Sequence, residues 1–156
     1  MISSIVQSLF PSIWLNHVLG RYNAKLLDRH FGNDKKHHRI AHSLNFDKAI
    51  KAMVESHNTR AKAVKFAPLQ TQGASENEKI LLSHALIGNR LITHGTEDEQ
   101  LKGYRFLNIT MGLINKKVAD NLSDGLLLPD IIRLISDSLS EFRSTCIGQA
   151  IAAENR

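Results

Sequence analysis

Histidines and basic residues gather in one short stretch, His37-His38-Arg39-Ile40-Ala41-His42, which follows Lys35 and Lys36. On a helix, His38 and His42 stand four residues apart on one face, a spacing at which two imidazoles can bind the same metal ion. A His-Glu-x-x-His metal site needs a glutamate after its first histidine, but this chain has Arg39 there. The neighbouring lysines oppose a cation further. We therefore expect no metal ion and no cofactor.

The same stretch lies within a strongly basic part of the chain. Residues 21–65 hold eleven Lys and Arg against four Asp and Glu, a net charge of +7, whereas residues 66–156 carry −2. Such asymmetry is typical of a surface for an acidic partner, which could be nucleic acid, an anionic membrane surface or an acidic protein. The alternative is a solvated basic face without a ligand. The residues expected to contact an anionic partner are Lys35, Lys36, Arg39, His38 and His42.

A second pair of residues with chemical potential is Arg90 and His94, which share one face of an expected helix. A guanidinium and an imidazole at this spacing can hold a phosphate and move a proton. The stretch 90–95, Arg-Leu-Ile-Thr-His-Gly, resembles the Arg…His pair of the small helical HEPN ribonucleases, and this resemblance implies a catalytic role for both residues. The HEPN pair has four to six intervening residues, and this chain has three. The alternative is a helix C-terminus at which His94 meets the negative end of the helix dipole.

Composition and length describe an ordinary globular chain. Its 156 residues are 42% hydrophobic and 22% charged, which excludes wholesale disorder, collagen and a coiled coil alone. A single cysteine excludes an internal disulfide, and the apolar stripe around Cys146 predicts a buried thiol. Residues 1–20 carry no charge and are amphipathic, but polar residues interrupt any apolar run that could span a membrane. We expect this segment to pack in the core or in a homodimer.

Helix start and stop signals predict an all-α fold. Two capping boxes, Ser75 with Glu78 and Thr96 with Glu99, can satisfy the free backbone N–H groups of a first helical turn. Apolar residues follow each box at helical spacing, and no segment shows the alternation of a strand. We expect one all-helical domain over residues 1–156, a helical bundle or helical-hairpin array of about five to seven helices. Residues 68–75 are expected to form an exposed loop.

Two further helices follow from apolar spacing. One begins after Asn45 and presents a single apolar seam, and another opens at Pro129 and carries its apolar residues inward as far as Cys146. The first seam comprises Phe46, Ile50, Met53, His57, Ala61 and Val64.

Part of the chain resembles a tetratricopeptide-type helical hairpin. The resemblance lies in the run from Ile87 to Leu91, in Gly95, and in Glu99-x-Leu101-x-x-Tyr104, while residues 46–53 are similar to the second helix of such a unit. It implies that Gly88 lets the neighbouring helix approach and that Gly95 lies in the interhelical turn. It departs from the pattern at His84, Gln100 and Gly112. A tetratricopeptide unit implies protein interaction.

The function that we expect is therefore that of a non-enzymatic, adaptor-like or effector-like protein with an unknown protein partner. The first alternative is a helical protein that binds nucleic acid through residues 21–65, and the second is a HEPN-like ribonuclease. The compact chain suggests a bacterial protein that acts in the cytoplasm or is delivered to a host cell. A homodimer is the self-association that the N-terminal segment favours.

Overall fold

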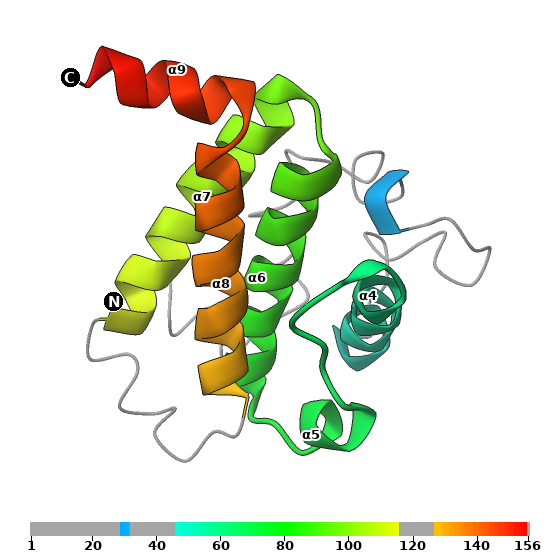
Figure 1. Cartoon of the computed structure of the whole chain (residues 1–156). Helices are drawn as coiled ribbons and strands as arrows, with labels where there is room; N and C mark the ends of the chain where they lie inside the picture. Colours follow the sequence, from blue (N-terminus) through cyan, green and yellow to red (C-terminus); the bar gives the residue numbers. More distant parts are fainter. Residues whose placement is uncertain (1–28, 32–45, 116–126, 156) are drawn as a thin grey trace.

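Figure 1 shows the computed structural model of the chain, which describes residues 29–31, 46–115 and 127–155. Within these ranges the structure contains helices and no strand, so the all-α prediction is confirmed. A short helical segment at residues 29–31 precedes six longer elements. These are α4 (Phe46–Arg60), α5 (Pro68–Gln72), α6 (Glu76–His94), α7 (Glu97–Asn115), α8 (Leu128–Arg143) and α9 (Cys146–Glu154). Across the same ranges, every helix is too short or too polar to traverse a lipid bilayer.

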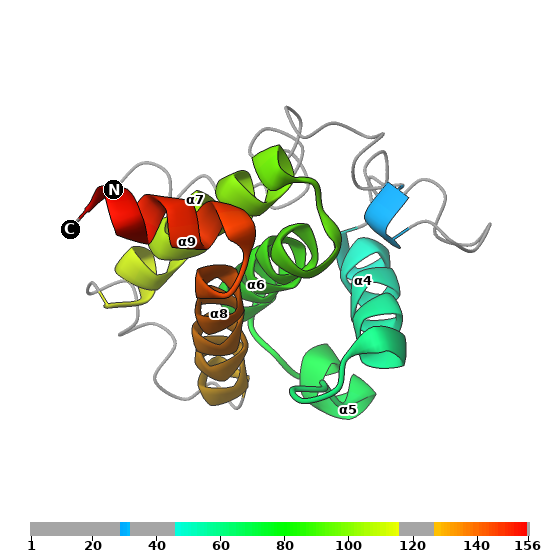
Figure 2. The same ribbon diagram turned by 45° about the horizontal axis from the view of Figure 1, so that its top comes forward.

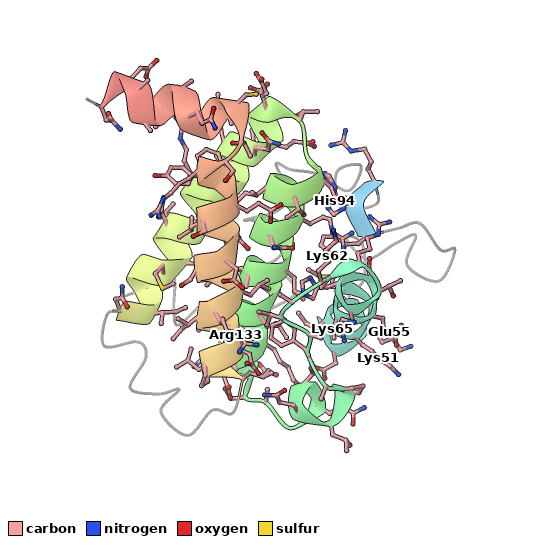
Figure 3. All side chains as sticks on the ribbon, viewed as in Figure 1. Lys51, Glu55, Lys62, Lys65, His94 and Arg133 are labelled. Atoms are coloured by element: carbon pink, nitrogen blue, oxygen red, sulfur yellow. The ribbon has the colours of Figure 1, made fainter. Side chains whose placement is uncertain are left out.

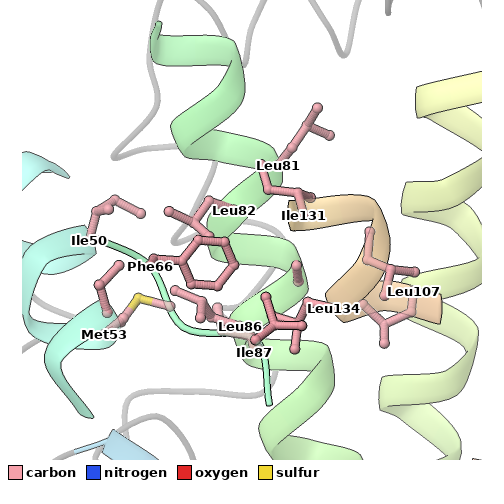
Figure 4. Packing of buried hydrophobic residues seen from close by; sticks show 14 of the residues in the cluster. Ile50, Met53, Phe66, Leu81, Leu82, Leu86, Ile87, Leu107, Ile131 and Leu134 are labelled. Atoms are coloured by element: carbon pink, nitrogen blue, oxygen red, sulfur yellow. The ribbon is translucent and has the colours of Figure 1, made fainter. Parts of the chain in front are cut away.

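Helix α6 is the centre of the fold. It packs against α7, α8 and α4, and the view in Figure 2 shows these three helices arranged around it. Nearly all of its residues from Ile80 to Ile92 are buried, because a helix with neighbours on several sides must be apolar all round. Figure 4 shows its Leu82 and Leu86 in the same apolar cluster as Phe66 and as side chains from α4, α7 and α8.

Two glycines let α6 and α7 approach each other closely. A Cβ atom added at Gly88 would overlap the side chain of Leu107, which is fully buried. A Cβ atom added at Gly103 would lie 2.9 Å from the carbonyl oxygen of Gly88 and 2.9 Å from the Cβ of Leu91. The close approach implied for Gly88 by the sequence is therefore present, and α7 contributes a second glycine to it.

Both predicted capping boxes are confirmed. The Ser75 hydroxyl accepts from the Glu78 N–H at 3.2 Å, and the Ser75 N–H donates to the Glu78 carboxylate at 3.3 Å. Thr96 and Glu99 make the equivalent pair at the start of α7, at 3.3 and 2.8 Å. The second oxygen of Glu78 accepts from the backbone N–H of Leu127 at 3.1 Å. One carboxylate thus joins the start of α6 to the start of α8.

The prediction of a loop over residues 68–75 is wrong for its first five residues, which form α5. Pro68 occupies the first turn of that helix, where its missing N–H costs nothing, and Gly73 follows its end. Most of the segment is exposed, as expected, although Thr71 is buried. The seam of α4 also ends earlier than predicted, because the helix stops at Arg60 and the buried Val64 lies in the connection after it.

The prediction of a buried Cys146 is wrong. Helix α8 ends at Arg143, and Thr145 caps a new helix by accepting from the Gly148 N–H at 3.0 Å. Cys146 is the first residue of this new helix and is exposed. The helical spacing from Phe142 to Cys146 suggested a single continuous helix, but the chain changes direction between the two residues (Figure 1).

Candidate functional site

Arg90 is the most unusual residue of the interior. Its side chain lies on α6, is only 2% exposed, and carries a charge into the core. Its Nη1 donates to the carbonyl oxygen of His30, and Nη1 and Nη2 lie 3.5 and 3.4 Å from the Ser56 hydroxyl. The guanidinium also lies 4.6 Å from the centre of the Phe31 ring. Neutral acceptors and an aromatic face therefore surround this cation.

Among the residues that the structure describes, no carboxylate forms an ion pair with Arg90. Burial, together with the positive charge of Arg60, lowers the pKa of Arg90 to about 10. Arg90 is still charged at neutral pH, because its pKa lies well above 7. Burial of a cation is costly where no counter-charge lies beside it, as holds for Arg90 within the described ranges.

His94 lies one turn further along α6 and is exposed. Its Nδ1 is 2.7 Å from the hydroxyl of Thr93, which itself donates to the Asn89 carbonyl at 2.9 Å. Partial burial, followed by the charges of Arg90 and Arg60, lowers the pKa of His94, and Glu141 acts in the opposite direction. The imidazole is therefore uncharged at neutral pH.

Arg90 and His94 line one hollow, which we call the α4–α6–α8 pocket. Its volume is about 350 Å³, within the range of small-molecule sites. The end of α4 and the connection after it form one wall with Arg60 and Lys62. The opposite wall is α8, with Asp137 and Glu141. The remaining lining residues are His57, Ala61, Ala63, Val64, Asn89, Thr93 and Leu134.

The connection that carries Lys62 is held in place by side chains of α4. The His57 ring contacts the Val64 carbonyl through Nε2 at 2.7 Å, and Asn58 exchanges two hydrogen bonds with the backbone of Phe66, at 2.7 and 3.0 Å. Burial lowers the pKa of His57, so the neutral ring donates its Nε2 hydrogen to that carbonyl. The basic wall of the pocket is thus fixed by buried polar contacts. Figure 3 shows Lys62 and His94 close together on the α4 side of α6.

A second hollow, the α4–α5 groove, lies on another face of α4. Its volume is about 430 Å³, and its lining includes Ile50, Val54 and Pro68. Charged residues of both signs also line it: Asp47, Lys48, Lys51, Glu55 and Lys79. Of these, Lys79 and Asp47 form an ion pair at 3.1 Å. The lining is completed by Asn58, Thr71 and Gln72.

Glu99 connects the short segment 29–31 to α7. It forms an ion pair with Arg29, and its carboxylate lies 3.6 Å from the Nε2 of His30, in addition to capping the helix. Burial acts to raise the pKa of Glu99, but the hydrogen bond from Thr96, the bond from Arg29 and the nearby bases together outweigh it and lower that pKa. These contacts hold the backbone carbonyl that Arg90 uses.

Of the predicted site residues, only Arg90 and His94 lie within the described ranges. Lys35, Lys36, Arg39, His38 and His42 lie outside them, as does the uncharged segment 1–20. Within the described ranges there is no group of three or more His, Cys, Asp or Glu residues that could hold a metal ion. Sequence reasoning did not select Arg60, Lys62, Asp137 or Glu141. The charge excess of residues 21–65 includes the two bases but does not distinguish them from their neighbours.

Comparison of the chain with protein-family models, with curated proteins and with solved structures finds no match.

Proposed function

We propose that the chain is a non-enzymatic protein-interaction module that binds an amphipathic helix of a partner protein in the α4–α5 groove. The observation that supports this most directly is the groove, which has a volume of about 430 Å³ and an apolar lining between two helices. An amphipathic helix in a hydrophobic groove is a recurrent mode of peptide recognition. Leu69 of α5 is 82% exposed and extends the apolar surface beside the groove.

The charges around the groove favour an acidic partner. Outside the ion pair of Lys79 with Asp47, the lining carries two lysines, Lys48 and Lys51, and one acid, Glu55. Charged residues at the rim of an interface act mainly on specificity and association rate, whereas the apolar centre contributes affinity. The partner helix should therefore present apolar residues to the groove and acidic residues to its lysine-rich edge.

The test is capture of partners from a lysate, followed by binding measurements with each captured protein and two matched pairs of variants. Gln72→Trp fills the groove, and its control, Gln149→Trp, makes the same change at an exposed residue of α9 that lines neither hollow. Lys51→Glu reverses a charge at the edge, and its control, Lys65→Glu, does so at an exposed residue outside both hollows (Figure 3). We expect at least about a tenfold loss of affinity in the first member of each pair and little change in the second. Equal binding by all four variants would refute the proposal.

The two alternatives remain predictions with tests of their own. A protein that binds nucleic acid through residues 21–65 should bind mixed oligonucleotides with an affinity that falls steeply as salt is raised, about one power of concentration per phosphate contacted. A HEPN-like ribonuclease should cleave RNA and lose that activity in His94→Ala. The partner's identity, a homodimer, a bacterial origin and a cytoplasmic or host location also stay predictions.

A further inference from the structure

The α4–α6–α8 pocket gathers three basic side chains on one side. Arg60 and Lys62 are exposed at its wall, and Arg90 is buried beside them on α6. Within the described part of the chain, none of the three forms an ion pair. Arg60 is near enough to Arg90 to lower its pKa, and no carboxylate among the described residues forms an ion pair with either of them. Such an arrangement is unfavourable in the empty pocket and becomes favourable when an anion enters.

Within the described residues, the Arg90 guanidinium has few hydrogen-bond acceptors. A guanidinium carries five N–H donors, and the acceptors found for it are the carbonyl oxygen of His30 and the hydroxyl of Ser56. Both acceptors are neutral, so neither supplies a negative charge. A phosphate in the pocket would meet the exposed Arg60 and Lys62 and bring negative charge close to Arg90, and charge-assisted bonds of this kind are stronger than neutral ones.

The opposite wall carries the opposite sign. Asp137 and Glu141 are exposed on successive turns of α8 and line the same hollow. Two carboxylates beside the bases would repel a long polyanion such as a nucleic-acid strand, because its successive phosphates would have to pass them. They would attract a cationic group attached to the same small molecule. The pocket therefore has a basic wall and an acidic wall, and its volume of about 350 Å³ limits the size of the occupant.

We propose that the α4–α6–α8 pocket binds a small zwitterionic phosphate, a molecule with a phosphate at one end and an ammonium group at the other. The phosphate lies against Arg60 and Lys62, with the charge of Arg90 beneath it. The ammonium group lies against Asp137 and Glu141. This site is separate from the α4–α5 groove, and it can be occupied whether or not a partner helix is bound there.

Calorimetric titration of the full-length protein with O-phosphoethanolamine tests the proposal. Inorganic phosphate and ethanolamine serve as probes that carry only the phosphate or only the ammonium group. Arg60→Gln and Lys62→Gln should each weaken binding of phosphoethanolamine by at least about fivefold. The control Lys65→Gln removes an exposed positive charge a few residues away and should leave binding unchanged. All three residues are exposed, so thermal melts should match that of the unmodified protein.

The acidic wall provides an independent arm. The double variant Asp137→Asn with Glu141→Gln should weaken binding of phosphoethanolamine but leave binding of inorganic phosphate equal or tighter, because two repelling charges are removed. A structural role of the carboxylates would not separate the two probes.

Three outcomes would overturn the proposal. The first is an unmodified protein that binds none of the probes at millimolar concentration. The second is binding that Arg60→Gln and Lys62→Gln leave intact. The third is binding of a mixed oligonucleotide, lost in these two variants, at concentrations at which phosphoethanolamine does not bind or compete. That last result would assign the bases to nucleic acid instead.

Discussion

The contact between α6 and α7 leads to a quantitative prediction for Gly103→Ala. The added methyl group would lie 2.9 Å from the Gly88 carbonyl oxygen and 2.9 Å from the Leu91 Cβ. Neither atom can move by rotation about a side-chain bond, so the two helices must separate. Overpacking of this kind costs about 1–3 kcal/mol, and contact with two fixed atoms favours the upper end of that range. Alanine returns about 1 kcal/mol through its higher helix propensity. We expect a net loss of about 2 kcal/mol in the free energy of unfolding.

Gly112→Ala is the matched control, because it changes the same residue type in the same helix. Among the described residues, no heavy atom outside the local helix lies within 4 Å of the new methyl group, so we expect only the gain in helix propensity of about 1 kcal/mol. The two variants should therefore differ by about 3 kcal/mol, or about 6–12 °C in melting temperature. Urea and thermal unfolding followed by circular dichroism would measure this difference. If Gly103→Ala were as stable as Gly112→Ala, the close packing of α6 on α7 would be refuted.

Three further predictions concern single residues. Burial lowers the pKa of His84 to about 3, so below the unfolded-state value of 6.5 the unfolded chain binds the extra proton. The free energy of unfolding should consequently decrease as the pH is lowered below 6.5, by about 2 kcal/mol at pH 5. His84→Gln should remove this part of the pH dependence, as measured by urea titrations at several pH values. Glu78→Ala should cost about 2–4 kcal/mol in urea unfolding, because it removes a cap and leaves the buried N–H of Leu127 without its acceptor, whereas Glu76→Ala in the same helical turn should cost a few tenths. Cys146 is exposed and should react fully with a thiol reagent in the native protein; a thiol protected until the chain unfolds would contradict its position at the start of α9.

Local signals predicted helices α4, α6, α7 and α8, but they missed α5 and the separate helix α9. A capping box acts within one turn, and apolar spacing reports the buried face of a single helix, so the start of α6 at Ser75 and the interior position of His84 could both be inferred from neighbouring residues. The same reasoning failed at Cys146. Cys146 follows Phe142 by four residues, about one helical turn, and the cap at Thr145 that ends this continuity has no glutamate or glutamine three residues later to mark it as a capping box.

The pocket could not be predicted in this way. Arg60 and Glu141 lie far apart in the sequence and line one hollow because α4 and α8 both pack beside α6. Arg90 was selected for its spacing from His94, but its burial depends on residues 29–31, which supply the carbonyl and the aromatic ring around it. Gly103 escaped notice because a glycine within a helix shows its purpose only when the neighbouring helix is in place.

The carboxylate of Glu78 has a consequence for the motions of the native chain. One of its oxygens serves the first turn of α6 and the other holds the Leu127 N–H, although the two residues are 49 positions apart. If the first turn of α6 frays, the Glu78 carboxylate moves and the Leu127 N–H at the start of α8 loses its acceptor. The amides at the start of α6 and at Leu127 should therefore exchange with deuterium at similar rates, as members of one cooperative opening unit. Glu78→Ala should split that unit, so that each amide then exchanges with its own protection factor.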